Sequence, residues 1–159
     1  MIKTYRYLKI FCLLCSLILI GCEPVKPLSL SIDTDKNNYR PNEQISLNVV
    51  LKNNSYQPIN ILRHIALEHY PFNIEVTISD GHALKFLGSE ISLDYEDSMF
   101  SEIASGDSYT THLNISLDDE NEMLFDFTKA GTYTIQLSYR SPHDRLIVDS
   151  NEIELTILE

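Results

Sequence analysis

Cysteine and tryptophan are scarce in this chain. The three cysteines lie at positions 12, 15 and 22, and none follows as far as Glu159, while tryptophan is missing altogether. No uncharged run reaches the roughly 20 apolar residues that a membrane-spanning helix needs. A domain formed after Cys22 therefore contains no disulfide, and packing alone must hold it together.

Basic residues are also few. The chain holds 12 Lys plus Arg against 23 Asp plus Glu, a net charge of −11. Three of the basic residues, Lys3, Arg6 and Lys9, stand at the extreme N-terminus, and without them the net charge is −14. Such a surface repels phosphate backbones and anionic headgroups, so nucleic acid is not an expected partner. It favours cationic partners without identifying one.

The first 22 residues have the pattern of an export signal. The three basic residues precede an uncharged run over residues 10–21, which has the length of a signal-peptide core. The run ends in Leu19-Ile20-Gly21-Cys22, which resembles the bacterial lipobox, where the cysteine is lipidated and becomes the first residue of the mature protein. A plain secretory signal or an uncleaved anchor is the alternative. Plain signals favour a small residue where this chain has Leu19, so the lipoprotein interpretation fits better.

This resemblance implies a domain organisation. Residues 1–21 are the expected lipoprotein signal peptide, Cys22 is the expected lipidation site, and residues 22–27 form a short tether. The tether contains two prolines, and the six residue steps from Cys22 to Leu28 span at most about 20 Å, at about 3.3 Å each. The domain is therefore expected close to a membrane surface. Glu23 is not the aspartate that retains enteric lipoproteins at the inner membrane, so we expect a lipid-anchored protein at the cell membrane or, where one exists, the outer membrane.

Alternation of apolar and polar residues dominates the chain from Leu28 onward. A period of two places the large residues on one face of a half-buried strand. The alternating runs are 28–32, 45–51, 59–61, 74–78, 113–117, 133–139 and 153–157. Turn residues separate them, and seven or eight strands over 28–159 predict an all-β, immunoglobulin-like antiparallel β-sandwich. A closed barrel is the alternative, but the irregular loop lengths favour the sandwich.

Two stretches interrupt this rhythm and are expected to be long loops. They are 63–72 and 88–107, and the second is strongly acidic up to Glu102. Binding residues concentrate in long loops, so these two are the predicted contact surface. The candidate binding residues are His64, His69, Tyr70, Asp94, Tyr95, Glu96 and Asp97. Residues 118–127 are compatible with a turn of helix, although the run is too short to decide.

Several short pieces follow one another in a recognisable order. They begin with Tyr39-Arg40-Pro41-Asn42-Glu43, continue through 47–55, 58–59, 72–76, 80–81, 86–88, 105–109 and 113–117, and end with Gly131-Thr132-Tyr133-Thr134-Ile135-Gln136-Leu137. Together they resemble the non-catalytic β-sandwich domain of bacterial deuterolysin-like (aspzincin) metallopeptidases. Those enzymes carry a His-Glu-x-x-His helix and a following aspartate ligand, and His-Glu-x-x-His is missing here. The resemblance therefore implies the fold and no catalysis.

Gly131-Thr132-Tyr133 also resembles the start of strand F in immunoglobulin-like domains. There a tyrosine hydroxyl bonds back to the backbone a few residues upstream. Tyr133 is the candidate for that role, and the alternative is an ordinary inward-facing aromatic.

Two stretches partly match the spacing of known metal sites, but neither has the full set of ligands in a suitable arrangement. His64 and His69 are five residues apart, which separates them by about 140° on a helix, so they do not share one ion there. Asp33, Asp35 and Asn37 match the first ligands of an EF-hand loop, but the required glycine and glutamate are Asn38 and Gln44. We expect polar turns at both places.

The acidic stretch 94–102 has oxygen ligands for calcium, but such loops are more often merely solvated. No metal and no cofactor is expected. The leading hypothesis is a non-enzymatic binding or accessory module with a protein partner in the envelope. The alternative is a proteinase inhibitor or protease-associated domain. The least favoured hypothesis is an enzyme built from His64, Glu68, His69 and the acidic stretch.

Overall fold

Ten strands make up the regular structure of the residues that the computed structural model describes, which are 26–62, 72–87, 96, 99–116, 123–141 and 146–159. They are β1 (Leu28–Thr34), β2 (Asn38–Tyr39), β3 (Ser46–Asn53), β4 (Ile59–Leu62), β5 (Phe72–Ile78), β6 (Phe100–Ile103), β7 (Ser108–Asn114), β8 (Gly131–Arg140), β9 (Ile147–Asp149) and β10 (Ile153–Ile157). The predicted all-β class is confirmed.

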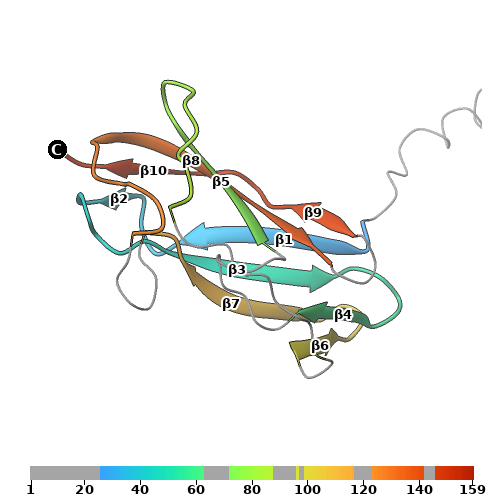
Figure 1. Cartoon of the computed structure of the whole chain (residues 1–159). Helices are drawn as coiled ribbons and strands as arrows, with labels where there is room; N and C mark the ends of the chain where they lie inside the picture. The colour runs from blue at the N-terminus through green and yellow to red at the C-terminus, as the bar shows by residue number, and fades with distance from the viewer. Residues whose placement is uncertain (1–25, 63–71, 88–95, 97–98, 117–122, 142–145) are drawn as a thin grey trace, which may run out of the picture.

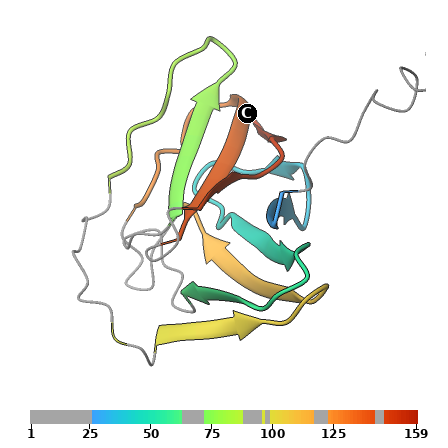
Figure 2. The same ribbon diagram turned by 90° about the vertical axis from the view of Figure 1, so that its right-hand side faces the viewer.

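The strands form two facing sheets and a small ribbon (Figure 1). One sheet has the order β1-β3-β7, and the other has the order β2-β10-β8-β5, with β9 also paired to β8. All pairs are antiparallel except β2 with β10. An immunoglobulin-like sandwich places strands A, B and E against C, F and G, and β1, β3 and β7 face β5, β8 and β10 in the same way. Figure 2 shows the β4–β6 ribbon beyond β7, at the margin of the first sheet.

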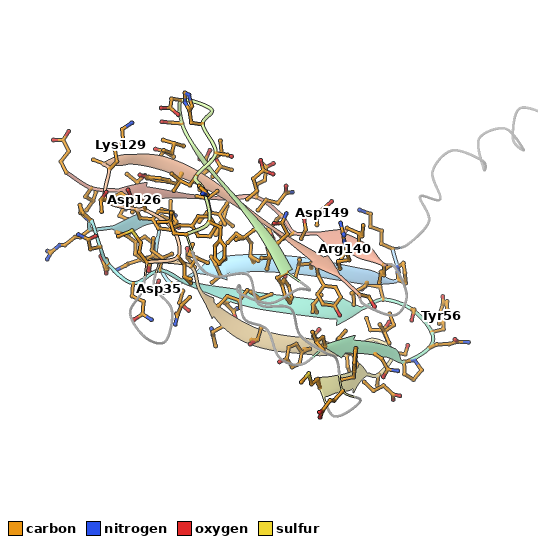
Figure 3. The ribbon with its side chains drawn as sticks, viewed as in Figure 1. Asp35, Tyr56, Asp126, Lys129, Arg140 and Asp149 are labelled. Atoms are coloured by element: carbon orange, nitrogen blue, oxygen red, sulfur yellow. The ribbon has the colours of Figure 1, made fainter. Side chains whose placement is uncertain are left out.

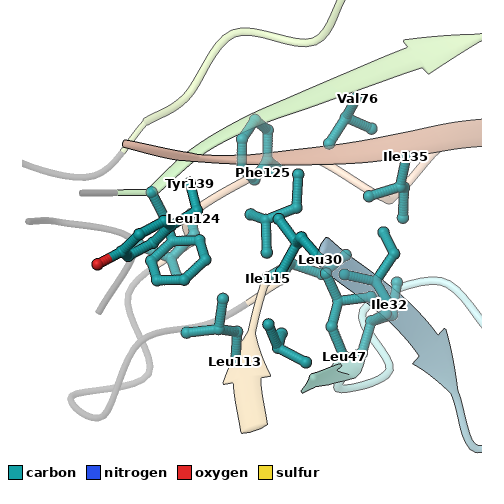
Figure 4. Close-up of a cluster of buried hydrophobic side chains, with 14 of the residues drawn as sticks. Leu30, Ile32, Leu47, Val76, Leu113, Ile115, Leu124, Phe125, Ile135 and Tyr139 are labelled. Atoms are coloured by element: carbon teal, nitrogen blue, oxygen red, sulfur yellow. The ribbon is translucent and has the colours of Figure 1, made fainter. Parts of the chain in front are cut away.

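The core lies between the two sheets and contains most residues of the predicted alternating runs, joined by residues outside those runs such as Tyr39, Phe125 and Phe127 (Figure 4). Leu47, Val49 and Leu51 of β3 are fully buried, as are Ile135 and Leu137 of β8. The residues between them in sequence point outward, which is the half-buried pattern of a two-layer fold. Burial of each such side chain contributes about 1.5–3 kcal/mol relative to leaving it exposed.

Tyr133 closes the corner where the chain enters β8. Its hydroxyl donates a hydrogen bond to the backbone oxygen of Lys129 over 2.6 Å, four residues upstream. Its ring packs edge-on against Phe127, with the ring centroids 5.2 Å apart. Burial and the nearby carboxylates of Asp126 and Asp80 raise the pKa of this hydroxyl, so it remains a donor. The predicted role of Tyr133 is confirmed.

The sequence left open whether 118–127 forms a turn of helix. The described part of this range, 123–127, contains no helix, and Leu124, Phe125 and Phe127 are each buried in the core. One local prediction needs correction. The stretch 88–107 is not one loop, since β6 lies within it and pairs with β4. Phe100 and Ile103 are the only large apolar residues of β6, so the strand depends on its partner rather than on its own pattern. The strands β2 and β9 are likewise too short to show a period.

A bulge connects β9 to β10. Between the pairs Ser138–Asp149 and Ile135–Ile153, residues 150–152 lie opposite the two residues 136 and 137 of β8. The bulge points Asn151 at the free edge of β1. The Asn151 side chain accepts a hydrogen bond from the N–H of Ile32 over 2.9 Å and donates one to its carbonyl over 3.0 Å. It therefore occupies backbone groups that an open edge would offer to another strand.

Candidate functional site

Most of the residues predicted to be functional lie outside the described part of the chain. These are Cys22, His64, His69, Tyr70, Asp94, Tyr95 and Asp97. Glu96 is the exception: it is exposed, and its backbone oxygen accepts a hydrogen bond from the N–H of Met99 over 2.9 Å. The predicted loops 63–72 and 88–107 are shortened by β5 and β6 to two binding segments, 63–71 and 88–99, and the structure shows how these are attached to the sandwich.

Both segments join one apolar cluster, which we call the loop base: Leu62, Phe72, Phe100 and Tyr139. Leu62 precedes the first segment and pairs with Phe100, which follows the second. The N–H of Leu62 donates a hydrogen bond over 3.3 Å to the hydroxyl of Tyr139. The Tyr139 ring lies 5.1 Å from that of Phe72, where the first segment ends. Two of the four attachment points, Leu62 and Phe72, therefore contact Tyr139 directly, and a third, Phe100, is joined to them through Leu62.

The fourth attachment point, at Leu87, is held from the other direction. The N–H of Leu87 donates a hydrogen bond to the Leu124 carbonyl over 2.9 Å, and the Phe86 ring packs 5.4 Å from that of Phe125. Phe125 is itself buried in the core. Both ends of both predicted binding segments are thus fixed to aromatic or aliphatic residues of the sandwich, so the scaffold beneath them is rigid.

A second organised feature is the turn between β3 and β4, which holds the start of the domain. Asn53 is fully buried and donates from its side-chain nitrogen to the carbonyls of Gln57 (2.7 Å) and Ile103 (2.9 Å). Its side-chain oxygen accepts from the N–H (2.8 Å) and the hydroxyl (2.7 Å) of Ser55. All the hydrogen-bonding capacity of this buried amide is used within the β3–β4 and β6–β7 connections.

Asn54 ties the same turn to the incoming chain. Its backbone N–H donates to the carbonyl of Pro27 over 2.8 Å, and its side-chain nitrogen donates to Ser29 over 2.9 Å and to the Lys26 carbonyl over 3.4 Å. The sequence shows Asn53-Asn54-Ser55 only as a turn. It carries no signal for the burial of Asn53 or for the contact of this turn with the chain start.

The opposite end of the sandwich carries ionisable groups in local hydrogen bonds. Asp35 accepts a hydrogen bond from the Tyr39 hydroxyl over 2.6 Å, and burial together with this bond raises the pKa of Tyr39 to about 12. Asp33 accepts from the backbone N–H of Thr34. The residues that matched an EF-hand loop thus satisfy their own turn. Within the described ranges, no group of three or more His, Cys, Asp or Glu side chains is placed to hold a metal ion.

An open groove of about 470 Å³ runs along the edge of β1 beside the bulge. Its lining residues are Ser31, Ile32, Asp33, Asn48, Val50, Asn151 and Ile153. The groove offers amide and hydroxyl groups and one carboxylate. Its lining includes no pair of ionisable side chains with which to transfer a proton.

Comparison with known proteins adds no family. No family model matches the chain, and no curated protein sequence matches it. Across the described residues, no helix has the length and apolar character needed to cross a membrane.

Proposed function

We propose that this chain is an exported bacterial lipoprotein, anchored through lipid on Cys22, whose immunoglobulin-like sandwich is a non-enzymatic binding or accessory module of the cell envelope. The N-terminal pattern of the sequence supports the anchor. The observation that carries the binding role is the loop base, because its contacts connect three of the four ends of the two predicted binding segments to one another. A rigid scaffold that presents loops is the usual architecture of a binding module.

The anchor is tested by the intact mass and membrane fractionation of the full-length protein beside the Cys22→Ala variant. The expected result is a lipid-sized mass increase and membrane retention in the natural sequence, both lost in the variant. Two or more acyl chains give stable attachment at about 0.8 kcal/mol per buried methylene, so retention should survive washing in high salt. A product of unlipidated mass that stays in the soluble fraction contradicts the proposal.

The binding role is tested by site-specific photo-crosslinking in cells. A photoreactive residue at Tyr95 or Tyr70 is expected to capture one discrete partner, whereas the same group at Glu152 is expected to capture none. Capture should fall when Asp94 and Glu96 are changed to alanine, because carboxylates contribute to the contact. The matched control changes Glu152 and Glu154, which are exposed and of equal charge, to alanine. Equal crosslinking from all positions contradicts a loop-directed partner.

A proteinase inhibitor is the second candidate, because a segment fixed at both ends is preorganised to enter an active site. The lipidated protein would be assayed against metallo-, serine and cysteine proteases from the envelope and the medium. Inhibition that is lost on cleavage within 63–71 or 88–99 assigns this role. Full protease activity across all three classes removes it.

A further inference from the structure

Tyr56 is the most exposed large hydrophobic side chain of the described residues. It is 99% exposed at the tip of the β3–β4 turn, whereas Tyr39, Tyr133 and Tyr139 are buried. The turn beneath it is rigid, because Asn53 and Ser55 on one side and Gln57 on the other share the buried hydrogen-bond network. The ring is therefore held outward by an ordered turn.

This tyrosine stands beside the point where the tether enters the domain. Asn54, two residues before it, binds the carbonyls of Lys26 and Pro27. From Cys22 to Lys26 is four residue steps, at most about 13 Å at about 3.3 Å each. A lipid on Cys22 thus holds the bilayer surface within about 13 Å of Lys26, whose carbonyl is bound by Asn54, two residues before Tyr56.

The end of the sandwich that carries Tyr56 and the start of the domain is called the tether end, and other side chains there also suit contact with a membrane. Ile147 is 56% exposed and pairs with Arg140, the last residue of β8. Figure 3 places Tyr56, Arg140 and Asp149 toward one end of the sandwich, and Asp35, Asp126 and Lys129 toward the other. An exposed tyrosine and an exposed isoleucine at the same end suit the bilayer interface, where amphipathic aromatic rings sit at headgroup level.

The described charged residues differ between the two ends of the sandwich. Toward the tether end, the described ionisable side chains include the cations Lys26, Lys52 and Arg140 and the carboxylates Glu102, Asp107 and Asp149. The other end gathers more carboxylates than cations. Its acidic residues are Asp33, Asp35, Glu43, Asp80 and Asp126, beside Lys36, Arg40 and Lys129. Among the described residues, cations and carboxylates thus balance at the tether end, whereas carboxylates exceed cations at the other end, so the tether end opposes contact with a negatively charged membrane surface less.

We infer that the tether end docks on the lipid surface, with Tyr56 seated among the headgroups, so that the sandwich stands upright on the bilayer. This inference rests on the proposed anchor at Cys22. Docking fixes which surfaces face the cell envelope, because a domain tied by a short tether and a seated aromatic has little freedom to roll.

The absence of tryptophan from the chain makes the test clean. A Tyr56→Trp variant introduces one indole at a fully exposed position, so folding is not disturbed. The matched control is Leu158→Trp, at a position that is 44% exposed and follows β10 at the opposite end. Both lipidated full-length proteins are placed in vesicles of phosphatidylethanolamine and phosphatidylglycerol carrying acyl chains brominated near the headgroup.

The expected result is indole emission from the Tyr56→Trp variant that shifts to shorter wavelength and is quenched by bromine several-fold more than emission from the Leu158→Trp variant. Equal, weak quenching in both variants, in protein whose mass shows the lipid, overturns the docking and leaves the anchor standing. Protein without lipid overturns both. Shielding of the indole in cells but not in vesicles shows that a protein covers position 56, which also overturns the inference.

Discussion

The two ends of the sandwich are stabilised by different chemistry. At the tether end, the neutral amides of Asn53 and Asn54 make hydrogen bonds to backbone groups, and Asn53 does so in full burial. At the other end, tyrosine hydroxyls bond to a carboxylate and to a backbone carbonyl near the surface, in the Asp35–Tyr39 and Tyr133–Lys129 contacts. The first network does not titrate, whereas the second does. The stability contributed by the network at the tether end is therefore independent of pH, whereas the contribution of the network at the far end changes with pH.

Removing the buried amide should produce the largest effect. Asn53→Ala leaves the carbonyls of Gln57 and Ile103 and the donors of Ser55 without their partner in a buried site. Each unsatisfied buried group costs about 1–3 kcal/mol, so we expect the free energy of unfolding to fall by about 3 kcal/mol or more. Urea denaturation followed by circular dichroism measures it. Asn60→Ala, at an exposed position of β4, is the control, and an equal loss in both variants would contradict the special role of Asn53.

Removing one hydroxyl at the far end should cost less. Tyr133→Phe keeps the buried ring and its contact with Phe127, and loses only the bond to the Lys129 carbonyl. A single hydrogen bond is worth about 0.5–1.5 kcal/mol, so a loss near 1 kcal/mol is expected in urea denaturation. Tyr56→Phe removes a hydroxyl from a fully exposed residue and should change nothing. A Tyr133→Phe variant as stable as the natural sequence would show that the corner bond is incidental.

These contrasts also mark what the sequence alone could predict. The alternating runs located β1, β3, β4, β5, β8 and β10, because a period of two reports a half-buried strand directly. The run 113–117 instead overlaps β7 only in the last two residues of that strand. The motif Gly131-Thr132-Tyr133 predicted the corner bond because donor and acceptor lie four residues apart. Local patterns are enough for features that are local in the chain.

Contacts between segments that are far apart in the chain have no corresponding local pattern in the sequence. The short strands β2, β6 and β9 exist only through pairing with other strands. The loop base depends on the contacts of Leu62 with Phe100 and of Phe72 with Tyr139, each decided by the packing of the whole sandwich. In the sequence, Asn53 has the pattern of a turn residue, and only the folded chain shows that its side chain is buried. The candidate residues of the two binding segments stay predictions, with Glu96 alone placed on the surface.

Alkaline conditions should weaken the far end. The pKa of Tyr39 is raised to about 12, mainly by burial and then by its bond to Asp35, so the folded state prefers the neutral phenol. The stability that this preference supplies is complete below the ordinary value near 10 and is lost as the pH rises toward 12. The difference in unfolding free energy between the natural sequence and Tyr39→Phe should therefore shrink between about pH 9 and about pH 12. A difference independent of pH would show that the hydroxyl is not retained by the fold.

Acid should give the smallest effect, through three carboxylates of the far end. Hydrogen bonds from Thr128 lower the pKa of Asp126, bonds from His82 lower that of Asp80, and Lys36 lowers that of Glu43. Carboxylates with lowered pKa values stabilise the fold above their ordinary values of 3.8 to 4.5, and this contribution disappears as the pH falls below them. Solvent screens the interactions of all three carboxylates, so the free energy of unfolding should change only slightly with pH.

The acid effect separates the two ends by a double comparison of urea midpoints at about pH 6 and about pH 3, on either side of the ordinary carboxyl pKa values. Asp126→Ala removes one titrating acceptor, so its stability should fall less between the two pH values than that of the natural sequence. Asn54→Ala weakens the tether end without touching a titrating group, so its loss should be the same at both. If Asn54→Ala instead flattened the pH dependence, the two ends would be coupled through the sheets, and the division into a constant end and a responsive end would fail.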